Sequence, residues 1–151
     1  MGKQNKRLTF AKTAVNKKLV ISEKVKDDKV IWRFHRVDKD GKFAFDTNRP
    51  DFSHKLLLEK LLAYSTMTWQ EIQQATHDKG KSKNHLIRNA QEDISKEAWQ
   101  RIEVMHLEEE SDSLYSFAIN NKVRVWGLKI GNEFHALWYD PYHEVFPVKR
   151  R

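Results

Sequence analysis

Hydrophobic and polar residues alternate along the first quarter of the chain in the way that is typical of β-strands. Residues 19–25 are rich in β-branched side chains, and residues 30–37 place large aromatic side chains on one face and basic ones on the other. A turn signal at residues 38–41 then leads into a short alternating stretch at residues 42–46. We therefore expect an N-terminal β-meander.

The middle of the chain carries the spacing and the capping signals of helices. Asp51 or Ser53 is expected to begin a first helix, and Thr68 with Glu71 forms a capping box that begins a second. A third helix is predicted over residues 95–105, before a solvated acidic connection. The apolar stripe of the first helix consists of five leucines, which are Leu56, Leu57, Leu58, Leu61 and Leu62.

The C-terminal part of the chain has the strongest strand pattern. Strands are predicted over residues 114–119, 122–130 and 133–139, and an Asp-Pro pair closes the last of them. Gly131-Asn132 is a two-residue hairpin turn of the favoured kind. These features predict a three-stranded antiparallel meander.

Together the elements predict one α+β domain over residues 19–151, preceded by a basic arm at residues 1–18. The helices are expected to cover one face of the sheet and to leave Lys and Arg side chains on the other. With one buried face, Trp126 and Trp138 are expected to differ in burial. The predicted buried positions of the sheet are Val125, Leu128, Phe134 and Leu137.

The net charge of +7 is concentrated at the N-terminus. Residues 1–26 contain eight Lys or Arg and one acid, whereas residues 27–151 contain twenty basic and twenty acidic residues. Such an arm binds phosphate backbones through counterion release, or it serves only as a solubilising tail. Both interpretations stay open.

Composition also excludes or disfavours several classes of chemistry. Cysteine is absent, which excludes disulfides and cysteine-ligated metal. The chain has five glycines and no glycine-rich phosphate loop, nucleophile elbow or His-Glu-x-x-His motif, so we expect no cofactor. No apolar run approaches the ~20 residues of a membrane span and no signal peptide begins the chain, so we expect a cytoplasmic protein without membrane contact.

Basic side chains gather in a polar loop that follows the second predicted helix, close in sequence to Trp69. Such a group suits a phosphate-rich partner, and its alternative role is that of a solvated loop. One further lysine begins the second strand of the predicted C-terminal sheet. The candidate nucleic-acid-binding residues are Lys79, Lys81, Lys83, His85, Arg88 and Lys122.

The predicted C-terminal sheet also presents groups that suit phosphoryl transfer. Arg124 shares a strand face with Lys122, and His135 shares a face with Tyr139 on the next strand. Arg can stabilise a pentavalent phosphate, while Tyr or His moves the proton of a ribose hydroxyl without a metal. The alternative is an ordinary half-solvated sheet face.

Two features of the chain are similar to one known family. They are the element order strand, helix, helix and three antiparallel strands, and the stretch YSFAINNKVRVWGLKIGNEFHALWYDPYHEVF. In both features the chain resembles the RelE/ParE superfamily of bacterial toxins. The likeness of element order covers roughly residues 30–151, and the likeness of sequence lies in the C-terminal stretch. By this resemblance Arg124 matches the strand arginine of the family. His143, with Tyr139 or Tyr142, matches its C-terminal acid/base position.

We therefore expect an RNA-binding protein with metal-independent endoribonuclease activity, as in a toxin of a toxin–antitoxin pair, whose partners are RNA and an antitoxin protein. The first alternative is a non-catalytic nucleic-acid- or protein-binding module from a defence or mobile-element locus. The second is a metal-dependent nuclease that uses His135, Asp140 and His143.

Overall fold

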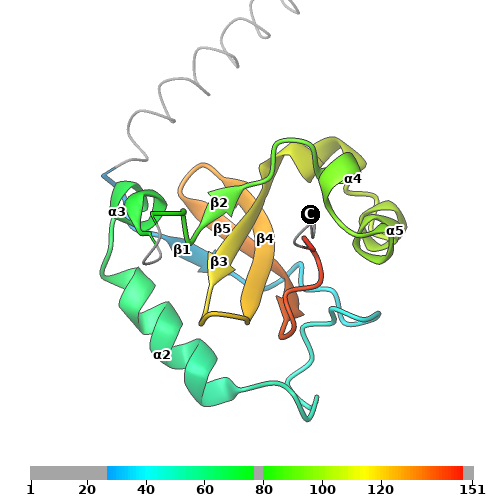
Figure 1. The fold of residues 1–151 in the computed structure, drawn as a ribbon, viewed down its shortest axis with the longest axis horizontal. Coiled ribbons are helices and arrows are strands. Elements are labelled where there is room, and N and C mark those ends of the chain that lie inside the picture. The colour runs from blue at the N-terminus through cyan, green and yellow to red at the C-terminus, as the bar shows by residue number, and fades with distance from the viewer. Residues whose placement is uncertain (1–26, 77–79, 148–151) are drawn as a thin grey trace, which may run out of the picture.

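A five-stranded sheet forms the centre of the molecule in the computed structural model, which describes residues 27–76 and 80–147 (Figure 1). The expected basic arm and the strand expected at residues 19–25 lie outside the described residues. The strand order is β1-β5-β4-β3-β2, in which β1 runs parallel to β5 and the other neighbours are antiparallel. The strands are β1 (Ile31–Arg33), β2 (His85–Leu86), β3 (Leu114–Ala118), β4 (Arg124–Ile130) and β5 (Glu133–Asp140). The expected mixed α+β class and the C-terminal three-stranded meander are both present.

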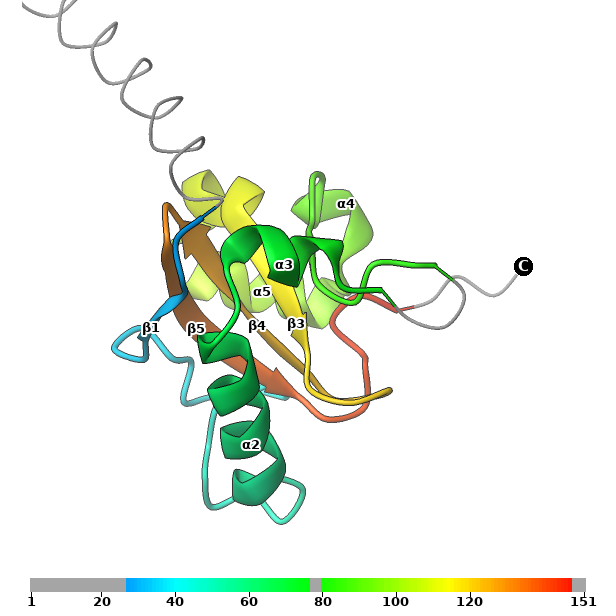
Figure 2. The same ribbon diagram turned by 90° about the vertical axis from the view of Figure 1, so that its left-hand side faces the viewer.

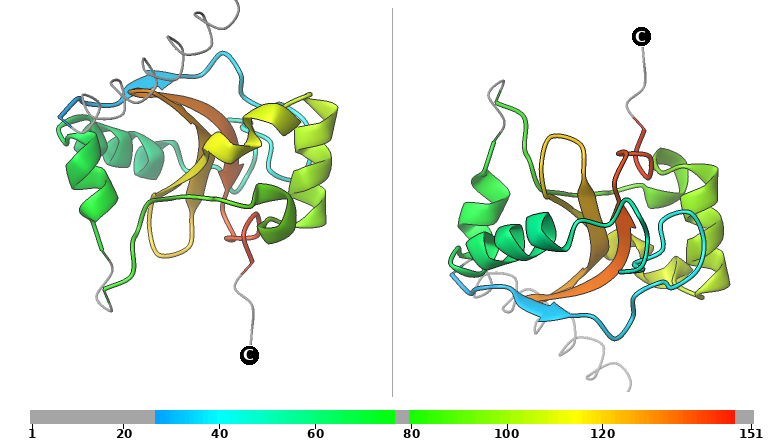
Figure 3. Two further views of the ribbon diagram at one scale, coloured as in Figure 1. Left: turned by 90° about the horizontal axis from the view of Figure 1, so that it is seen from above. Right: turned by 90° about the horizontal axis from the view of Figure 1, so that it is seen from below.

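Helices cover both faces of this sheet, with α2 and α3 on one side and α4 and α5 on the other (Figures 1 and 3). The side chains of Ser53, Thr68 and Ser95 cap three of the helices, and Thr68 forms its capping box with Glu71. None of the described helices is long and apolar enough to cross a membrane. The helices are α2 (His54–Ser65), α3 (Trp69–Gln74), α4 (Ala90–Asp93), α5 (Lys96–Val104) and the 3₁₀ helix η1 (Glu108–Ser113).

The expected N-terminal β-meander is wrong for the described residues. Only Ile31–Arg33 forms a strand in this region, and it pairs with distant β5 rather than with a sequence neighbour. The loop at residues 38–45 instead crosses the end of β5, because its Asp38 amide donates to the Leu137 carbonyl and its Phe43 carbonyl accepts from the Tyr139 amide. The alternation of side chains in residues 30–37 and 42–46 therefore reflects the contact of this region with β5, and not a hairpin.

Two apolar clusters, one on each face of the sheet, replace the single core that was predicted. Val125 and Phe134 pack in the cluster under α2 and α3, whereas Leu128 and Leu137 pack in the cluster under α5. These two pairs cannot share a face, since Val125 and Leu128 are an odd number of residues apart on one strand. The open face that was expected to carry Lys and Arg side chains is therefore absent from the described sheet.

A bulge in β5 explains why both central tryptophans face the same apolar cluster and are buried in it. Trp126 pairs with Trp138, but the next residue of β4, Gly127, pairs with Ala136, which leaves Leu137 as an extra residue. Leu137 and Trp138 consequently face the same cluster although they are adjacent in sequence. Trp126 and Trp138 are 1% and 0% exposed, so the expectation that they differ is wrong.

Gly127 sits where no side chain fits. A Cβ atom at this position would overlap the His135 carbonyl oxygen and approach Cζ of Phe134 to 2.6 Å. Because the obstacle is backbone on the neighbouring strand, the clash can be relieved only by moving β4 away from β5. This glycine lets the two strands pair closely beside the bulge.

The leucine stripe of α2 is only partly buried. Leu57 lies in the core, but Leu58 and Leu62 are 59% and 61% exposed. The helix lies across the sheet with one narrow edge inward, and Figure 2 shows it at the end of the molecule away from α5. The prediction that Leu58 and Leu62 cover the sheet is therefore wrong, whereas Leu57 does so.

Candidate functional site

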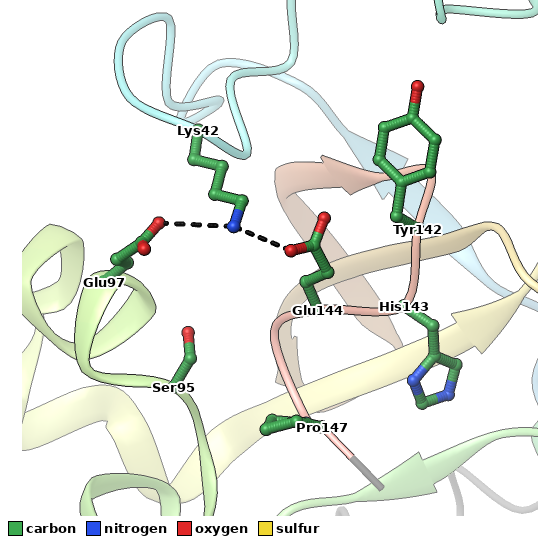
Figure 4. Close-up of a pocket in the computed structure, with 7 residues that line it drawn as sticks. All are labelled: Lys42, Ser95, Glu97, Tyr142, His143, Glu144 and Pro147. Atoms are coloured by element: carbon green, nitrogen blue, oxygen red, sulfur yellow. Dashed lines mark ion pairs between the residues drawn. The ribbon is translucent and has the colours of Figure 1, made fainter.

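An open hollow of about 470 Å³ lies beside the segment that follows β5 (Figure 4). Three parts of the chain line it: the loop between β1 and α2, the first turn of α5, and the segment 142–147. Its lining residues are Lys42, Ser95, Glu97, Tyr142, His143, Glu144 and Pro147.

The shape of the segment after β5 is set by one buried carboxylate. Asp140 is 1% exposed, and its two oxygens accept the backbone amides of Glu144 and Val145, both at 2.9 Å. The indole Nε1 of Trp126 donates to the same carboxylate at 3.2 Å. The Ser95 amide then donates to the Val145 carbonyl, which ties the segment to the start of α5. Asp-Pro therefore closes the strand, as predicted, and also folds the chain back.

His143 lies at the tip of this fold-back, with a backbone φ of 57°. A non-glycine residue with positive φ costs on the order of 1 kcal/mol and persists only where its surroundings impose it. The Nδ1 atom of its imidazole is shielded from solvent and has no hydrogen-bond partner. Figure 4 shows the ring pointing away from Lys42 and Glu144. His143 therefore combines a strained backbone with a ring nitrogen that no group satisfies.

Lys42 carries the positive charge of the hollow. Its Nζ lies 2.7 Å from an oxygen of Glu144 and 3.6 Å from an oxygen of Glu97. The hydrogen bond to Glu144, opposed by burial and supported by the charge of Glu97, raises the pKa of Lys42 above its ordinary value. Lys42 is therefore charged at neutral pH, and it joins α5 to the segment after β5.

Arg124 is part of the structural framework rather than of the hollow. It begins β4, is 5% exposed, and its Nη1 donates to the carbonyls of Asn120 at 2.7 Å and Val123 at 3.1 Å. Burial lowers its pKa below the usual value for arginine. Among the described residues Arg124 forms no ion pair with Glu133 or Asp140: Glu133 contacts Arg33 and His135, and Asp140 binds Trp126 and backbone amides.

Tyr139 faces the opposite side of the sheet from the first turn of α5. It is 1% exposed, its ring lies 4.3 Å from that of Phe52, and its hydroxyl accepts the Ser53 amide at 3.2 Å. A hydroxyl held in the core beneath α2 does not reach a substrate. This corrects the expectation that Tyr139 is an acid/base group, and of the three predicted catalytic residues only His143 lines the hollow.

The predicted basic cluster divides among several places. Lys79 lies outside the described residues, while Lys81 is exposed and Lys83 is half-buried. Arg88 lines a second hollow, about 320 Å³ in volume, whose wall also contains Trp99 and three carboxylates. These side chains therefore do not form one basic surface.

Two members of that set lie against the segment after β5. His85, on edge strand β2, has its ring 6.2 Å from that of Phe146. Lys122, in the turn before β4, has its Nζ 5.0 Å from the ring centre of Tyr142. Both contacts place a nitrogen-bearing side chain from another strand beside residues 142–146.

The residues proposed as metal ligands do not meet. His135 Nε2 contacts Glu133 at 3.0 Å and its ring packs against His35, while Asp140 is occupied by its three hydrogen bonds. Among residues 27–76 and 80–147 no group of three His, Asp or Glu is placed to hold a metal ion. The metal-nuclease alternative is thereby contradicted for His135 and Asp140.

Sequence reasoning missed Lys42, Ser95 and Glu97, because each comes from a different part of the chain and none stands in a motif. Ser95 was recognised only as the approximate start of a helix, and in the structure its side chain caps α5. The one sequence signal for the hollow was the run Asp-Pro-Tyr-His-Glu at residues 140–144, in which side chains that can bind ligands or transfer protons follow a turn.

Comparisons of the chain with protein-family models, with curated proteins and with solved structures gave no match.

Proposed function

We propose that the protein binds RNA beside the hollow and cleaves it without a metal ion, with His143 as the proton-transfer group, as a toxin of a toxin–antitoxin pair does. The observation that carries this proposal is His143, a residue that lines the open hollow and combines a strained backbone with a buried, unsatisfied Nδ1. Strained backbone and unsatisfied buried polar atoms are concentrated at functional sites.

The chemistry requires few groups. The ribose 2′ oxygen attacks the adjacent phosphorus as its proton passes to His143, and the bond from phosphorus to the 5′ oxygen breaks. The 5′ oxygen takes a proton from water, and the hydroxide formed takes the proton held by His143. The products are a cyclic phosphate and a free 5′ hydroxyl, and the imidazole is neutral again. Imidazole suits this role because its reference pKa of ~6.5 lies near neutral pH. Lys42 lines the same hollow, but its ammonium group is paired with Glu144 and Glu97 and the His143 ring points away from it, so the proposal assigns no step to Lys42.

Attraction for RNA comes from the ends of the chain. Residues 27–76 and 80–147 contain 16 Lys or Arg and 19 Asp or Glu, so this part carries a net negative charge. The excess of positive charge belongs to residues 1–26 and to Lys149, Arg150 and Arg151.

The test is RNA cleavage in the presence of EDTA, measured with the wild-type protein, His143→Ala and His143→Gly. Glycine adopts positive φ without strain, so the second variant removes the imidazole and leaves the backbone conformation intact. We expect both variants to lose at least ~100-fold in cleavage. Full cleavage by a folded His143→Gly protein would refute the assignment, and loss of cleavage on chelation would refute the metal-independent mechanism.

The second candidate function is a non-catalytic binding module. The observation that favours it is the charge of the hollow, where Glu97 and Glu144 outnumber Lys42 and oppose an incoming phosphate. RNA binding without cleavage at any pH would support this alternative against the first.

A further inference from the structure

Tyr142 is an aromatic side chain that the cleavage chemistry leaves unused. It lines the hollow, directly precedes His143 and is 50% exposed, although Pro141 and Val145 on either side of the fold-back are buried. A large aromatic ring that stays half-exposed beside a candidate site is a common recognition element for ligands with flat faces.

Two contacts hold the ring in place. Lys122 Nζ lies 5.0 Å from the ring centre, which is within the range of a cation–π contact. The pKa of Asp51 is lowered mainly by Arg49, and the smallest contribution comes from the hydroxyl at the other end of the Tyr142 ring, which lies near that carboxylate. The ring is therefore oriented before any ligand arrives.

The ring and the candidate acid/base group leave the backbone in different directions. Figure 4 shows the Tyr142 ring and the His143 imidazole on opposite sides of the same segment. A nucleotide chain that crosses this segment can therefore place one base against Tyr142 and a neighbouring ribose against His143.

We propose that Tyr142 stacks on one unpaired nucleobase while Lys122 contacts a phosphate of the same strand, so that the substrate is single-stranded RNA. This inference rests on the proposed RNA binding. Bases within a duplex stack on one another and do not offer a free face, whereas an unpaired base does. The Lys122 ammonium lies over one face of the Tyr142 ring, so the base stacks on the other face. An aromatic platform with a cation along the backbone is the arrangement that single-strand binding uses.

The experiment measures binding by fluorescence anisotropy, with a labelled 2′-O-methyl oligoadenylate of about ten nucleotides, a length within the usual range of single-strand sites. The methyl group blocks attack by the 2′ oxygen, so binding is separated from cleavage. The proteins are wild type, Tyr142→Ala, Tyr142→Phe and Lys122→Ala. Phe34→Ala is the matched control, because Phe34 is also an exposed aromatic residue, 42% exposed, on the β1 side.

Loss of one stacked base is expected to weaken binding about 5- to 150-fold in Tyr142→Ala, whereas Tyr142→Phe keeps the ring and stays close to wild type. Lys122→Ala is expected to lower the salt slope by about 0.7, the value for one phosphate of a single strand. Phe34→Ala should bind like wild type, and the duplex form should bind more weakly than the single strand.

Two outcomes would overturn the inference in distinguishable ways. If the wild type binds the oligonucleotide and Tyr142→Ala binds it equally well, or the duplex binds as tightly, the stacking role is wrong and RNA binding stands. If the wild type binds neither form even at low salt, the proposed function fails and the inference fails with it.

Discussion

Replacing Asp140 by alanine tests whether one buried carboxylate holds together the end of β5 and the segment that carries His143. Three donors reach this carboxylate: the amides of Glu144 and Val145 at 2.9 Å and the indole of Trp126 at 3.2 Å. Hydrogen bonds to a charged acceptor contribute about 1.5–3 kcal/mol each, less the cost of burying the carboxylate itself.

The magnitude follows from what happens to the donors. Val145 and Trp126 are 0% and 1% exposed, so in Asp140→Ala their N–H groups stay buried without an acceptor, at about 1–3 kcal/mol each. The Glu144 amide, in a half-buried residue, regains a water molecule and costs less. We expect the free energy of unfolding to fall by about 3–5 kcal/mol in Asp140→Ala. Asp140→Asn keeps one acceptor oxygen and should lose less.

The assay is equilibrium unfolding in urea followed by tryptophan fluorescence and by circular dichroism. Asp27→Ala is the control, since Asp27 is exposed and its loss should change stability by less than ~0.5 kcal/mol. The urea dependence should keep its slope, which indicates that the denatured state is unaltered. A loss below ~1 kcal/mol with an unchanged slope would refute the argument that this carboxylate organises the turn.

Four further predictions follow from the fold and from the charges. Gly127→Ala should cost more than ~3 kcal/mol in urea unfolding, because its Cβ meets β5 backbone, and a loss below ~1 kcal/mol would show that the strands can separate there. Leu57→Ala should lose about 2–4 kcal/mol while Leu58→Ala loses less than ~0.5, and equal losses would contradict the orientation of α2. Arg36 lowers the pKa of Glu110 below its ordinary 4.5, and Arg49 lowers the pKa of Asp51 below 3.8. The stabilisation from each ion pair is therefore complete above those values and is lost as the pH falls through the depressed pKa of the folded state. A Glu110→Gln variant should show a flatter fall of melting temperature in acid, and an unchanged fall would contradict the ion pair. Deleting residues 1–18 should lower the salt slope of RNA binding by about 0.7 per lost phosphate contact, and an unchanged slope would limit these residues to solubility.

Local signals in the sequence predicted local structure correctly. Of the two candidate caps for the first helix, Ser53 is the one used, and Thr68 caps the second as expected, because a cap depends only on side chains within one helical turn. The third helix begins beside Ser95, close to its expected start. The Gly131-Asn132 turn likewise fixes the hairpin of β4 and β5. Features within a few residues of one another were therefore accessible from sequence.

Features that depend on distant contacts were not accessible. The parallel pairing of β1 with β5 leaves no local mark, and so the alternation near Trp32 suggested a hairpin. The bulge at Leu137 changes which face later residues occupy, which a strict period of two cannot reveal. The buried position of Tyr139 follows from that same shift, and it removed one of three predicted catalytic groups.

The candidate site was predicted in one part only. His143 stands in a run whose turn signal and polar side chains indicated exposure, and it lines the hollow. Arg124 was taken for a substrate contact because a charged residue in a strand usually faces solvent. Its guanidinium instead satisfies the carbonyl groups of the turn that precedes β4, which only the folded chain reveals.

The pairing of β1 with β5 also determines when the protein can fold during its synthesis. Ile31 pairs with Glu133, and closing a loop of about 100 residues costs on the order of 4 kcal/mol of chain entropy before any contact is made. The pairing that offsets this entropy loss involves β5, which is the last strand of the sheet to be translated. The strand β4 also pairs with β5. The hollow, too, needs the segment that follows β5. Ribosomes therefore finish nearly the whole described chain before the sheet is complete, and chains that stop before residue 133 lack both β5 and the site.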